Sequence, residues 1–262
     1  MKIELHKGNC LEVMKSIPDG SVDMILCDLP YAITSNSWDS IIPFDRLWSE
    51  YKRICSGMIV LTAAQPFTSA LIMSNQKGFR HTWTWIKKRP TGFQNAKKMP
   101  LRATEDIVVF GVTGGTYNPQ GITRIDKVCS NSKSAGGGNV RGDVEGSSGK
   151  GSLRTAGKQY VQEFTNYPKN VLEYGADEGN KVHPTQKPVA LMEYLIRTYS
   201  NEGDVVLDNC MGSGTTGVAC CNLSRSFIGI EMDENYFNIA SKRIAEAQAR
   251  CTGCKSITKG TK

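Results

Sequence analysis

Short runs of apolar residues, each ended by a polar residue or a chain breaker, constrain this fold more than any other feature. The stretch from Val22 to Cys27 is typical of a strand that is buried on both faces of a sheet. Similar runs occur at 58–62, 82–86, 106–110, 205–207 and 226–230. Residues with helical periodicity lie at 43–55, 66–75, 188–199 and 234–249. Strands that alternate with helices indicate an α/β fold with a doubly wound, mainly parallel sheet that is covered on both faces.

The composition fits a soluble globular protein. The chain has 262 residues, of which 39% are apolar and 22% are charged. No apolar run approaches the roughly 20 residues of a membrane helix, and the N-terminus lacks the apolar stretch of a secretory signal. The nine cysteines are scattered, as expected for free thiols in a reducing compartment. We therefore expect a cytoplasmic protein that makes no contact with membrane.

The cysteine pattern also bears on metal binding. Cys251 and Cys254 form a CxxC pair at the tail, but the sequence offers no second ligand pair and only three histidines. A lone CxxC is a weak zinc signal. We expect no metal.

Positive charge is concentrated between Tyr51 and Thr104. This span has no Asp or Glu and holds ten Lys and Arg residues, whereas the whole chain has a net charge of +7. A field of one sign attracts a polyanion, although a solvated basic face is the alternative. Trp83, Trp85 and Phe93 lie among the charges and offer surfaces for base stacking. We expect contacts with nucleic acid from Lys87, Lys88, Arg89, Lys97, Lys98 and Arg102.

A glycine-rich loop follows the strand expected at 205–207 and opens onto a helix. Gly212, Gly214 and Gly217 satisfy the GxGxxG pattern, in which glycines permit a tight turn and let a ligand approach the backbone. Glu231 ends the next strand, where a carboxylate accepts hydrogen bonds from ribose hydroxyls. These features predict an adenosyl ligand. They do not distinguish S-adenosylmethionine from NAD, so a dehydrogenase stays open at this point.

A second motif, Asp28-Leu29-Pro30-Tyr31, ends the first buried strand. Ligands of an open α/β sheet bind beyond the carboxyl ends of the strands, so both motifs belong on one rim if both strands lie in one parallel sheet. The amino nitrogen of adenine is a poor nucleophile because its lone pair is delocalised into the ring. Two acceptors that bond its protons would orient it and stabilise the positive charge that develops during attack.

We assign these roles within the tetrapeptide. Asp28 and the carbonyl of Leu29 are the two acceptors, Pro30 shapes the turn, and Tyr31 stacks on the base. For the tetrapeptide alone, an ordinary X-Pro turn at the end of a strand is the alternative.

Taken in chain order, these motifs resemble the DNA amino-methyltransferases of the β arrangement, which methylate N6 of adenine or N4 of cytosine. In that family an Asp-Pro-Pro-Tyr motif precedes a target-recognition region, and the cofactor segment comes last. The hexapeptide from His183 to Pro188 resembles the family's segment between the recognition region and the cofactor half, and the run from Lys88 to Lys98 is similar to one in phage-type adenine methyltransferases. The resemblance covers nearly the whole chain.

The resemblance implies a Rossmann-like fold and S-adenosylmethionine as cofactor. The residues expected at the cofactor are Asn9, Asp208, Gly212, Ser213, Gly214, Thr215, Thr216, Glu231, His183 and Lys187. Residues 111–182 hold 14 of the 26 glycines. We therefore expect the catalytic half at 1–110, a target-recognition insert at 111–182, the cofactor-binding half of the same domain at 183–250 and a disordered tail at 251–262.

Two residues depart from the family pattern. Leu29 replaces the first proline, which preserves the carbonyl acceptor but removes a restraint on φ. Asn9 stands where relatives often carry an Asp that binds the adenine amino group of the cofactor, and its amide oxygen can still accept that bond. Asp28 indicates adenine N6, because cytosine-N4 enzymes of the family usually have Ser there.

The resemblance implies a site-specific DNA methyltransferase that flips its target adenine out of the duplex. A cytosine-N4 DNA methyltransferase is the nearest alternative. A DNA-binding protein that masks sites without methylating them is an alternative of another class, and a glutamine or RNA methyltransferase is a third. A partner endonuclease, as in restriction–modification, is compatible with the sequence but not implied by it.

Overall fold

A computed structural model of the chain describes residues 1–31, 41–111, 115–130, 159–175 and 186–257. The chain divides into two compact units. One comprises residues 1–118 and 169–262, and the other comprises residues 119–168.

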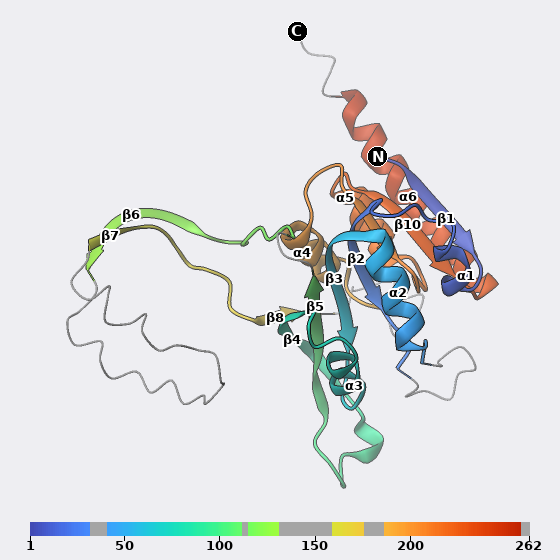
Figure 1. Ribbon diagram of the computed structural model, residues 1–262, viewed down its shortest axis with the longest axis horizontal. Coiled ribbons are helices and arrows are strands. Elements are labelled where there is room, and N and C mark those ends of the chain that lie inside the picture. Colours follow the sequence, from blue (N-terminus) through green and yellow to red (C-terminus); the bar gives the residue numbers. More distant parts are fainter. Residues whose placement is uncertain (32–40, 112–114, 131–158, 176–185, 258–262) are drawn as a thin grey trace. The chain divides into compact units, whose positions relative to one another are not determined.

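An eight-stranded sheet forms the centre of the larger unit, with strand order β1-β10-β9-β2-β3-β5-β4-β8 (Figure 1). Among the strands that the structure describes here, only β5 runs antiparallel to its neighbours. The mainly parallel sheet predicted from the sequence is confirmed. The strands are β1 (Ile3–Lys7), β2 (Val22–Asp28), β3 (Cys55–Ala63), β4 (Phe79–Thr91), β5 (Arg102–Gly111), β8 (Val171–Tyr174), β9 (Val205–Asp208) and β10 (Ser226–Glu231).

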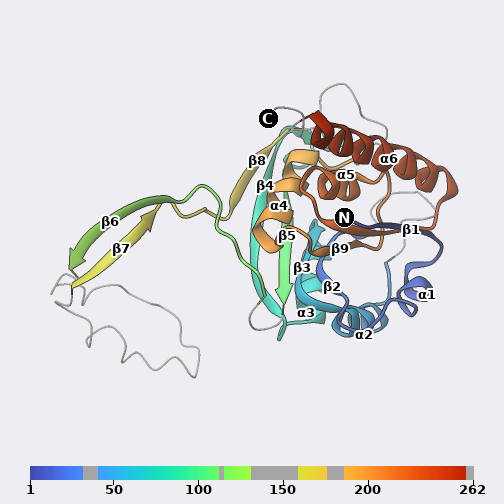
Figure 2. The same ribbon diagram turned by 90° about the horizontal axis from the view of Figure 1, so that it is seen from above.

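Helices cover both faces of this sheet (Figure 2). One face packs against α1 (Cys10–Met14), α2 (Phe44–Ile54) and α3 (Phe67–Ser74). The opposite face packs against α4 (Val189–Tyr199), α5 (Thr215–Asn222) and α6 (Glu234–Ile257). A short 3₁₀ helix, η1 (Phe93–Asn95), lies between β4 and β5. None of the helices in the described part of the chain is long and apolar enough to span a membrane.

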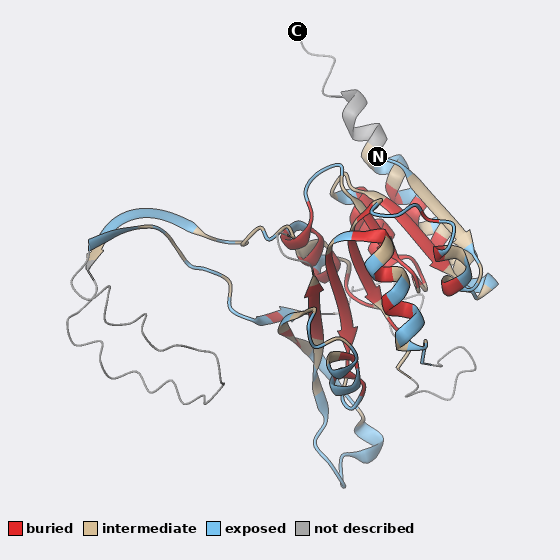
Figure 3. Ribbon diagram, in the orientation of Figure 1, coloured by how far each residue is buried: buried red, intermediate tan, exposed pale blue. Residues whose placement is uncertain are grey.

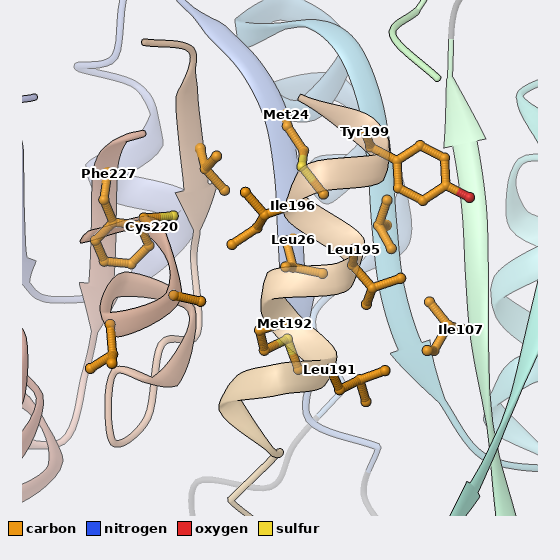
Figure 4. Close-up of a cluster of buried hydrophobic side chains, with 14 of the residues drawn as sticks. Met24, Leu26, Ile107, Leu191, Met192, Leu195, Ile196, Tyr199, Cys220 and Phe227 are labelled. Atoms are coloured by element: carbon orange, nitrogen blue, oxygen red, sulfur yellow. The ribbon is translucent and has the colours of Figure 1, made fainter. Parts of the chain in front are cut away.

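The two apolar cores follow from the alternation of side chains along each strand. Met24 and Leu26 of β2 point to the α4–α6 face, whereas Ile25 and Cys27 point to the α1–α3 face. In the first core, α4 places Leu191, Met192, Leu195 and Ile196 over β2 (Figure 4). Burying one such side chain contributes about 1.5–3 kcal/mol. The central strands are therefore buried on both faces (Figure 3), as the apolar runs predicted.

The smaller unit contains an antiparallel pair, β6 (Thr123–Ser130) and β7 (Gln159–Thr165). It lies within the expected insert at 111–182. Val128, Tyr160 and Val161 of this ribbon are exposed. A two-stranded ribbon by itself is marginally stable in water.

The C-terminal end of α6 differs from the sequence prediction. Disorder was expected from Cys251, but the helix continues to Ile257, and only 258–262 lie outside the described residues. Ala240, Ile244, Ala247 and Cys251 recur at helical spacing and pack on the α4–α6 core, and the Cys251 thiol donates to the carbonyl of Cys221 at 3.4 Å. This apolar stripe anchors the helix as far as Cys251.

Candidate active site

Two motifs that are far apart in the sequence end neighbouring strands. β2 ends at Asp28 and β9 ends at Asp208, and the two strands pair in parallel through Met24 with Val206 and Ile25 with Leu207. The carboxyl ends of parallel strands lie on one rim of the sheet. The structure therefore brings the tetrapeptide and the glycine-rich loop to the same rim.

Asp28 uses both carboxylate oxygens within the protein. Its Oδ1 accepts a hydrogen bond from the Tyr31 hydroxyl at 2.6 Å and another from the Thr62 hydroxyl. Its Oδ2 accepts from Lys187 Nζ at 2.8 Å. Burial and then the charge of Asp28 raise the pKa of Tyr31 well above its ordinary value, so its hydroxyl keeps the proton that it donates.

The rest of the tetrapeptide is anchored by packing. Leu29 is buried in the α1–α3 core, which fixes a backbone that lacks the family's first proline. The Tyr31 ring lies 5.0 Å from the ring of Phe67, measured between centroids. In this state the Tyr31 ring therefore packs on Phe67, and its hydroxyl occupies one acceptor site of the Asp28 carboxylate.

Three residues at Asp28 or next to it were not assigned there from the sequence, namely Thr62, Lys187 and Glu105. Lys187 was expected at the cofactor, but the structure places its ammonium between Asp28 and Glu105, whose Oε2 is 3.3 Å away. Glu105, on β5, has a single signal in the sequence: it is the first acid after the acid-free span from Tyr51 to Thr104. His183, from the same hexapeptide as Lys187, lies outside the described residues.

The glycine-rich loop has the backbone conformations that glycine permits. Gly212 and Gly214 have φ values of +49° and +80°, which few other residues adopt. A Cβ at Gly214 would lie 2.9 Å from the Cβ of Ala240, so this glycine also allows α6 to approach the loop. At Gly212 a Cβ would meet nothing within 4 Å, so the loop is open on that side.

Glu231 is held by the backbone of this rim. Its Oε2 accepts from the amide of Gly212 and its Oε1 from the amide of Asp233, both at 2.8 Å. Burial raises the pKa of Glu231, whereas these amides act in the opposite direction. Each carboxylate oxygen retains a second lone pair, so the residue can still accept hydrogen bonds from two ribose hydroxyls. The open loop and this oriented carboxylate fit an adenosyl cofactor.

Asp208 organises the loop from within. It is buried, its Oδ2 accepts from the Thr216 hydroxyl at 2.6 Å, and its Oδ1 accepts from the Cys210 amide at 3.1 Å. Burial raises its pKa to about 7. Arg243 of α6 holds the next turn through the carbonyl and hydroxyl of Ser213, at 2.5 and 3.0 Å, and lies 3.4 Å from the Thr215 hydroxyl. The expected contacts of these residues with a cofactor stay predictions.

Asn9 lies on the same rim. β1 pairs with β10, and the Gly8 amide donates to the carbonyl of Glu231 at 2.9 Å. The Asn9 side chain caps α1 by accepting from the Leu11 amide at 2.9 Å. Its expected contact with the cofactor therefore shares an oxygen with a helix cap.

The predicted DNA-binding residues lie on the connection between β4 and β5 and on the strand ends that flank it. Lys97 and Lys98 are on the connection itself, whereas Lys87, Lys88 and Arg89 end β4 and Arg102 begins β5. β4 runs parallel to β2, so this connection extends beyond the rim that carries Asp28. Phe93 is 82% exposed there. Lys87 differs, because its ammonium contacts Glu105 at 3.2 Å. The exposed basic residues of the connection and of these strand ends are Lys88, Arg89, Lys97, Lys98 and Arg102.

The prediction that Trp83 and Trp85 offer stacking surfaces is wrong. They are 2% and 5% exposed and belong to the α4–α6 core. Both lie on the same face of β4, two residues apart, and the sequence does not reveal that a helix covers that face.

A family model described as DNA methylase, covering adenine-N6 and cytosine-N4 enzymes, matches residues 22–242. The chain belongs to this DNA methylase family. Two curated relatives are type II methyltransferases. M.HpaI of Haemophilus parainfluenzae is 27% identical, over 90% of this chain and 72% of the relative, and M1.MboII of Moraxella bovis is 26% identical, over 91% and 95%. The family predicted from the motifs is confirmed, and the dehydrogenase alternative is wrong.

Solved structures support the fold of this DNA methylase. The complex of M1.HpyAVI with S-adenosylmethionine matches with a TM-score of 0.60 at 24% identity, over 92% of this chain and 98% of the other. The cytosine-N4-specific PvuII DNA methyltransferase matches with a TM-score of 0.64 at 16% identity, over 96% and 93%. In the described part of the DNA methylase, no group of His, Cys, Asp and Glu residues could hold a metal ion.

Proposed function

We propose that this DNA methylase transfers a methyl group from S-adenosylmethionine to N6 of adenine in double-stranded DNA. The observation that carries the proposal is the position of Asp28 at the end of β2, directly beside the strand that opens the glycine-rich loop. A charged acceptor and an adenosyl site thus share one rim. The presence of S-adenosylmethionine in the complex of M1.HpyAVI, a protein of similar fold, supports the choice of cofactor.

Three parts of the rim would hold the cofactor. Glu231 accepts from the ribose hydroxyls, Asn9 faces the adenine, and the turn from Gly212 to Thr216 takes the methionine portion. When bound, S-adenosylmethionine supplies a methyl group on a positively charged sulfur, and the target nitrogen forms the new C–N bond with its lone pair as the C–S bond breaks. The protein's task is to present that lone pair and to stabilise the charge that appears on the nitrogen.

Asp28 and Leu29 provide the two acceptors for the target amino group. The Leu29 carbonyl lies on a backbone that is fixed by the buried leucine side chain. Asp28 stabilises the positive charge on the attacking nitrogen and is placed to accept the proton that this nitrogen loses. For this to occur, the Tyr31 hydroxyl leaves Oδ1 of Asp28, and the freed ring stacks on the base.

The amino group of adenine is buried in the duplex, so we include base flipping in the proposal. The β4–β5 connection projects from the same rim, where its lysines and arginines contact phosphates and Phe93 offers a stacking surface. In this proposal the residues at the end of the sheet carry out methyl transfer, and the β4–β5 connection binds the DNA. A DNA substrate is consistent with a cytoplasmic protein.

Cytosine N4 is the second candidate. The PvuII methyltransferase, which shares the fold, is cytosine-N4-specific. Cytosine also presents an amino group with two protons, so the same pair of acceptors serves it. The choice of adenine rests on Asp28.

The test uses purified protein, tritiated S-adenosylmethionine and duplexes that together contain all short sequence contexts. Labelled DNA is digested to nucleosides, which separate N6-methyladenine from N4-methylcytosine. Asp28→Ala is the matched control and should lose transfer while it retains cofactor binding. Cofactor binding without any DNA labelling would refute the proposal and favour a DNA-binding protein that masks sites. Exclusive labelling of cytosine would replace adenine by the second candidate.

A further inference from the structure

Four charged side chains of alternating sign lie in a row that begins at Asp28. Lys187 Nζ is 2.8 Å from Asp28 Oδ2 and 3.3 Å from Glu105 Oε2. Lys87 Nζ is 3.2 Å from Glu105 Oε1. The members come from the end of β2, the segment before α4, β5 and β4, so the tertiary fold assembles the row from distant parts of the chain.

The row is largely removed from water. Lys187 is buried, and the side chains of Lys87 and Glu105 are 12% and 19% exposed. A buried charge is costly unless an opposite charge accompanies it. Burial lowers the pKa of Lys187, but the carboxylates of Asp28 and Glu105 raise it by more. The net effect is a raised pKa, so Lys187 stays an ammonium ion.

The geometry of the row is not one that strongly stabilises the folded state. Oε2 of Glu105 is buried and has no hydrogen-bond partner among the described residues, and Lys187 approaches it only as an ion pair. A buried acceptor that lacks a hydrogen bond is unfavourable. Well-packed apolar residues in place of a buried ion pair are often equally stable or more so. The value of the row therefore lies in its effect on Asp28.

We propose that Lys187 and Glu105 are positioning residues that act together on Asp28. Lys187 holds Oδ2 at 2.8 Å, and the Thr62 hydroxyl donates to Oδ1. The second lone pair of Oδ1 is therefore left for the target amino group once Tyr31 withdraws. Glu105 offsets the charge of Lys187, which would otherwise repel the positive charge that develops on the amino nitrogen. This inference rests on one part of the proposed function, namely that Asp28 accepts a hydrogen bond from the target amino group.

The two residues act on the ionisation of Asp28 in opposite directions. Loss of Lys187 removes an attractive charge 2.8 Å from Oδ2 and makes ionisation harder. Loss of Glu105 removes a like charge, which lies at most about 6 Å away because both carboxylates contact the same ammonium, and makes ionisation easier. The other groups that face Asp28 are kept in both variants. They are Tyr31, Thr62, Cys27 and Asp208.

Carbon-13 NMR of the free protein tests this inference without reliance on turnover. Protein labelled at aspartate Cγ is titrated with acid, and the Asp28 resonance is assigned by its absence from Asp28→Asn. We expect the titration midpoint of this resonance to be higher in Lys187→Met than in the wild type, because an opposite charge has been removed. In Glu105→Gln the midpoint should be lower, because a like charge has been removed.

Lys87→Met is the matched control, because it removes the same charge from the far end of the row. Its midpoint should rise by less than half as much as that of Lys187→Met. Lys187→Arg keeps the charge and should keep the wild-type midpoint. If Lys187→Met does not fold, the midpoints of Lys187→Arg and Glu105→Gln together test the proposal.

Midpoints that stay at the wild-type value, or that move in the same direction in Lys187→Met and Glu105→Gln, overturn the proposal. Substitutions that only disturb packing would leave both midpoints unchanged or shift both in the same direction. Single-turnover methylation at saturating cofactor should follow the NMR: the pH below which the rate falls moves up in Lys187→Met and down in Glu105→Gln. A wild-type protein that methylates no DNA refutes the proposed function, whereas the NMR titration still tests the row.

Discussion

Tyr31 offers a sharp test of the proposed active site, because its hydroxyl and its ring are expected to act in opposite directions. The hydroxyl lies 2.6 Å from Asp28 Oδ1, where it occupies the acceptor that the target amino group needs. A hydrogen bond to a charged group contributes about 1.5–3 kcal/mol. The displaced hydroxyl recovers part of this by bonding to water, which leaves a net cost of about 1 kcal/mol, or about fivefold in an equilibrium constant.

Tyr31→Phe should therefore retain kcat/KM for DNA methylation or raise it by up to about fivefold. Tyr31→Ala removes the stacking surface as well. Stacking of a base on an aromatic ring contributes about 1–3 kcal/mol, so kcat/KM should fall by about 5- to 150-fold. The assay is initial-rate transfer of tritiated methyl groups to duplex DNA at saturating cofactor.

Equal losses in Tyr31→Phe and Tyr31→Ala would refute this reasoning, because the hydroxyl would then be needed in the reaction itself. Tyr117→Phe is the matched control. Tyr117 packs on Tyr199 at a distance of 6.0 Å between ring centroids, away from the rim, and its hydroxyl should not affect the rate.

Three further predictions concern the cofactor loop and the basic connection. Burial raises the pKa of Asp208 in the folded state to about 7, above the ordinary 3.8, so the folded protein holds this proton more tightly than the unfolded chain. The contribution of Asp208 to stability should therefore be lost as the pH rises from about 4 to about 7, by up to about 4 kcal/mol relative to Asp208→Asn in urea unfolding. Gly214→Ala should lower the free energy of unfolding by about 1–3 kcal/mol, because its Cβ would lie 2.9 Å from Ala240. Replacement of Lys97 and Lys98 by Ala should reduce the slope of log K for DNA against log salt by about 1.8.

Each of these predictions has a control within the chain. A pH profile of unfolding that is the same for Asp208→Asn and wild type would contradict the first. Gly20→Ala, at a φ of +64° but with open space around its Cβ, should cost less than Gly214→Ala, and an equal cost would show that packing on α6 is irrelevant. Lys2 precedes β1 at the opposite rim, so Lys2→Ala should leave the salt slope unchanged. If Lys2→Ala reduced the salt dependence of DNA binding as much as the loss of Lys97 and Lys98, this would argue against a role for the β4–β5 connection.

The fold was predictable because local patterns determine it. Val22–Asp28 and Val205–Asp208 read as buried strands, and the breakers that follow them mark the rim where ligands bind. β1 and β8 were missed because each is short and mixes polar with apolar residues. Their place in the sheet depends on neighbours that are distant in the sequence.

The site was only partly predictable, for a related reason. Asp28 and the glycine-rich loop carry their own local signatures, whereas Glu105 acquires its position from an antiparallel strand pairing that no short motif announces. Lys187 belongs to a hexapeptide that resembles a cofactor segment, yet it contacts a carboxylate 159 residues away. Which residues meet across a sheet depends on strand order, and strand order is a property of the whole fold.

Because β2 and β9 pair side by side, the half of the chain that contains Asp28 and the half that contains Asp208 could follow each other in either order along the sequence. The strands are joined by pairing and by the Asp23 carboxylate, which accepts from the amide of Val205 at 2.8 Å across 182 residues. The seam on which the active site depends is therefore non-covalent. A gene that encodes the Asp28 half after the Asp208 half, or that encodes them as two polypeptides, specifies the same seam, so rearrangement of the coding order is an evolutionary route that leaves the chemistry intact.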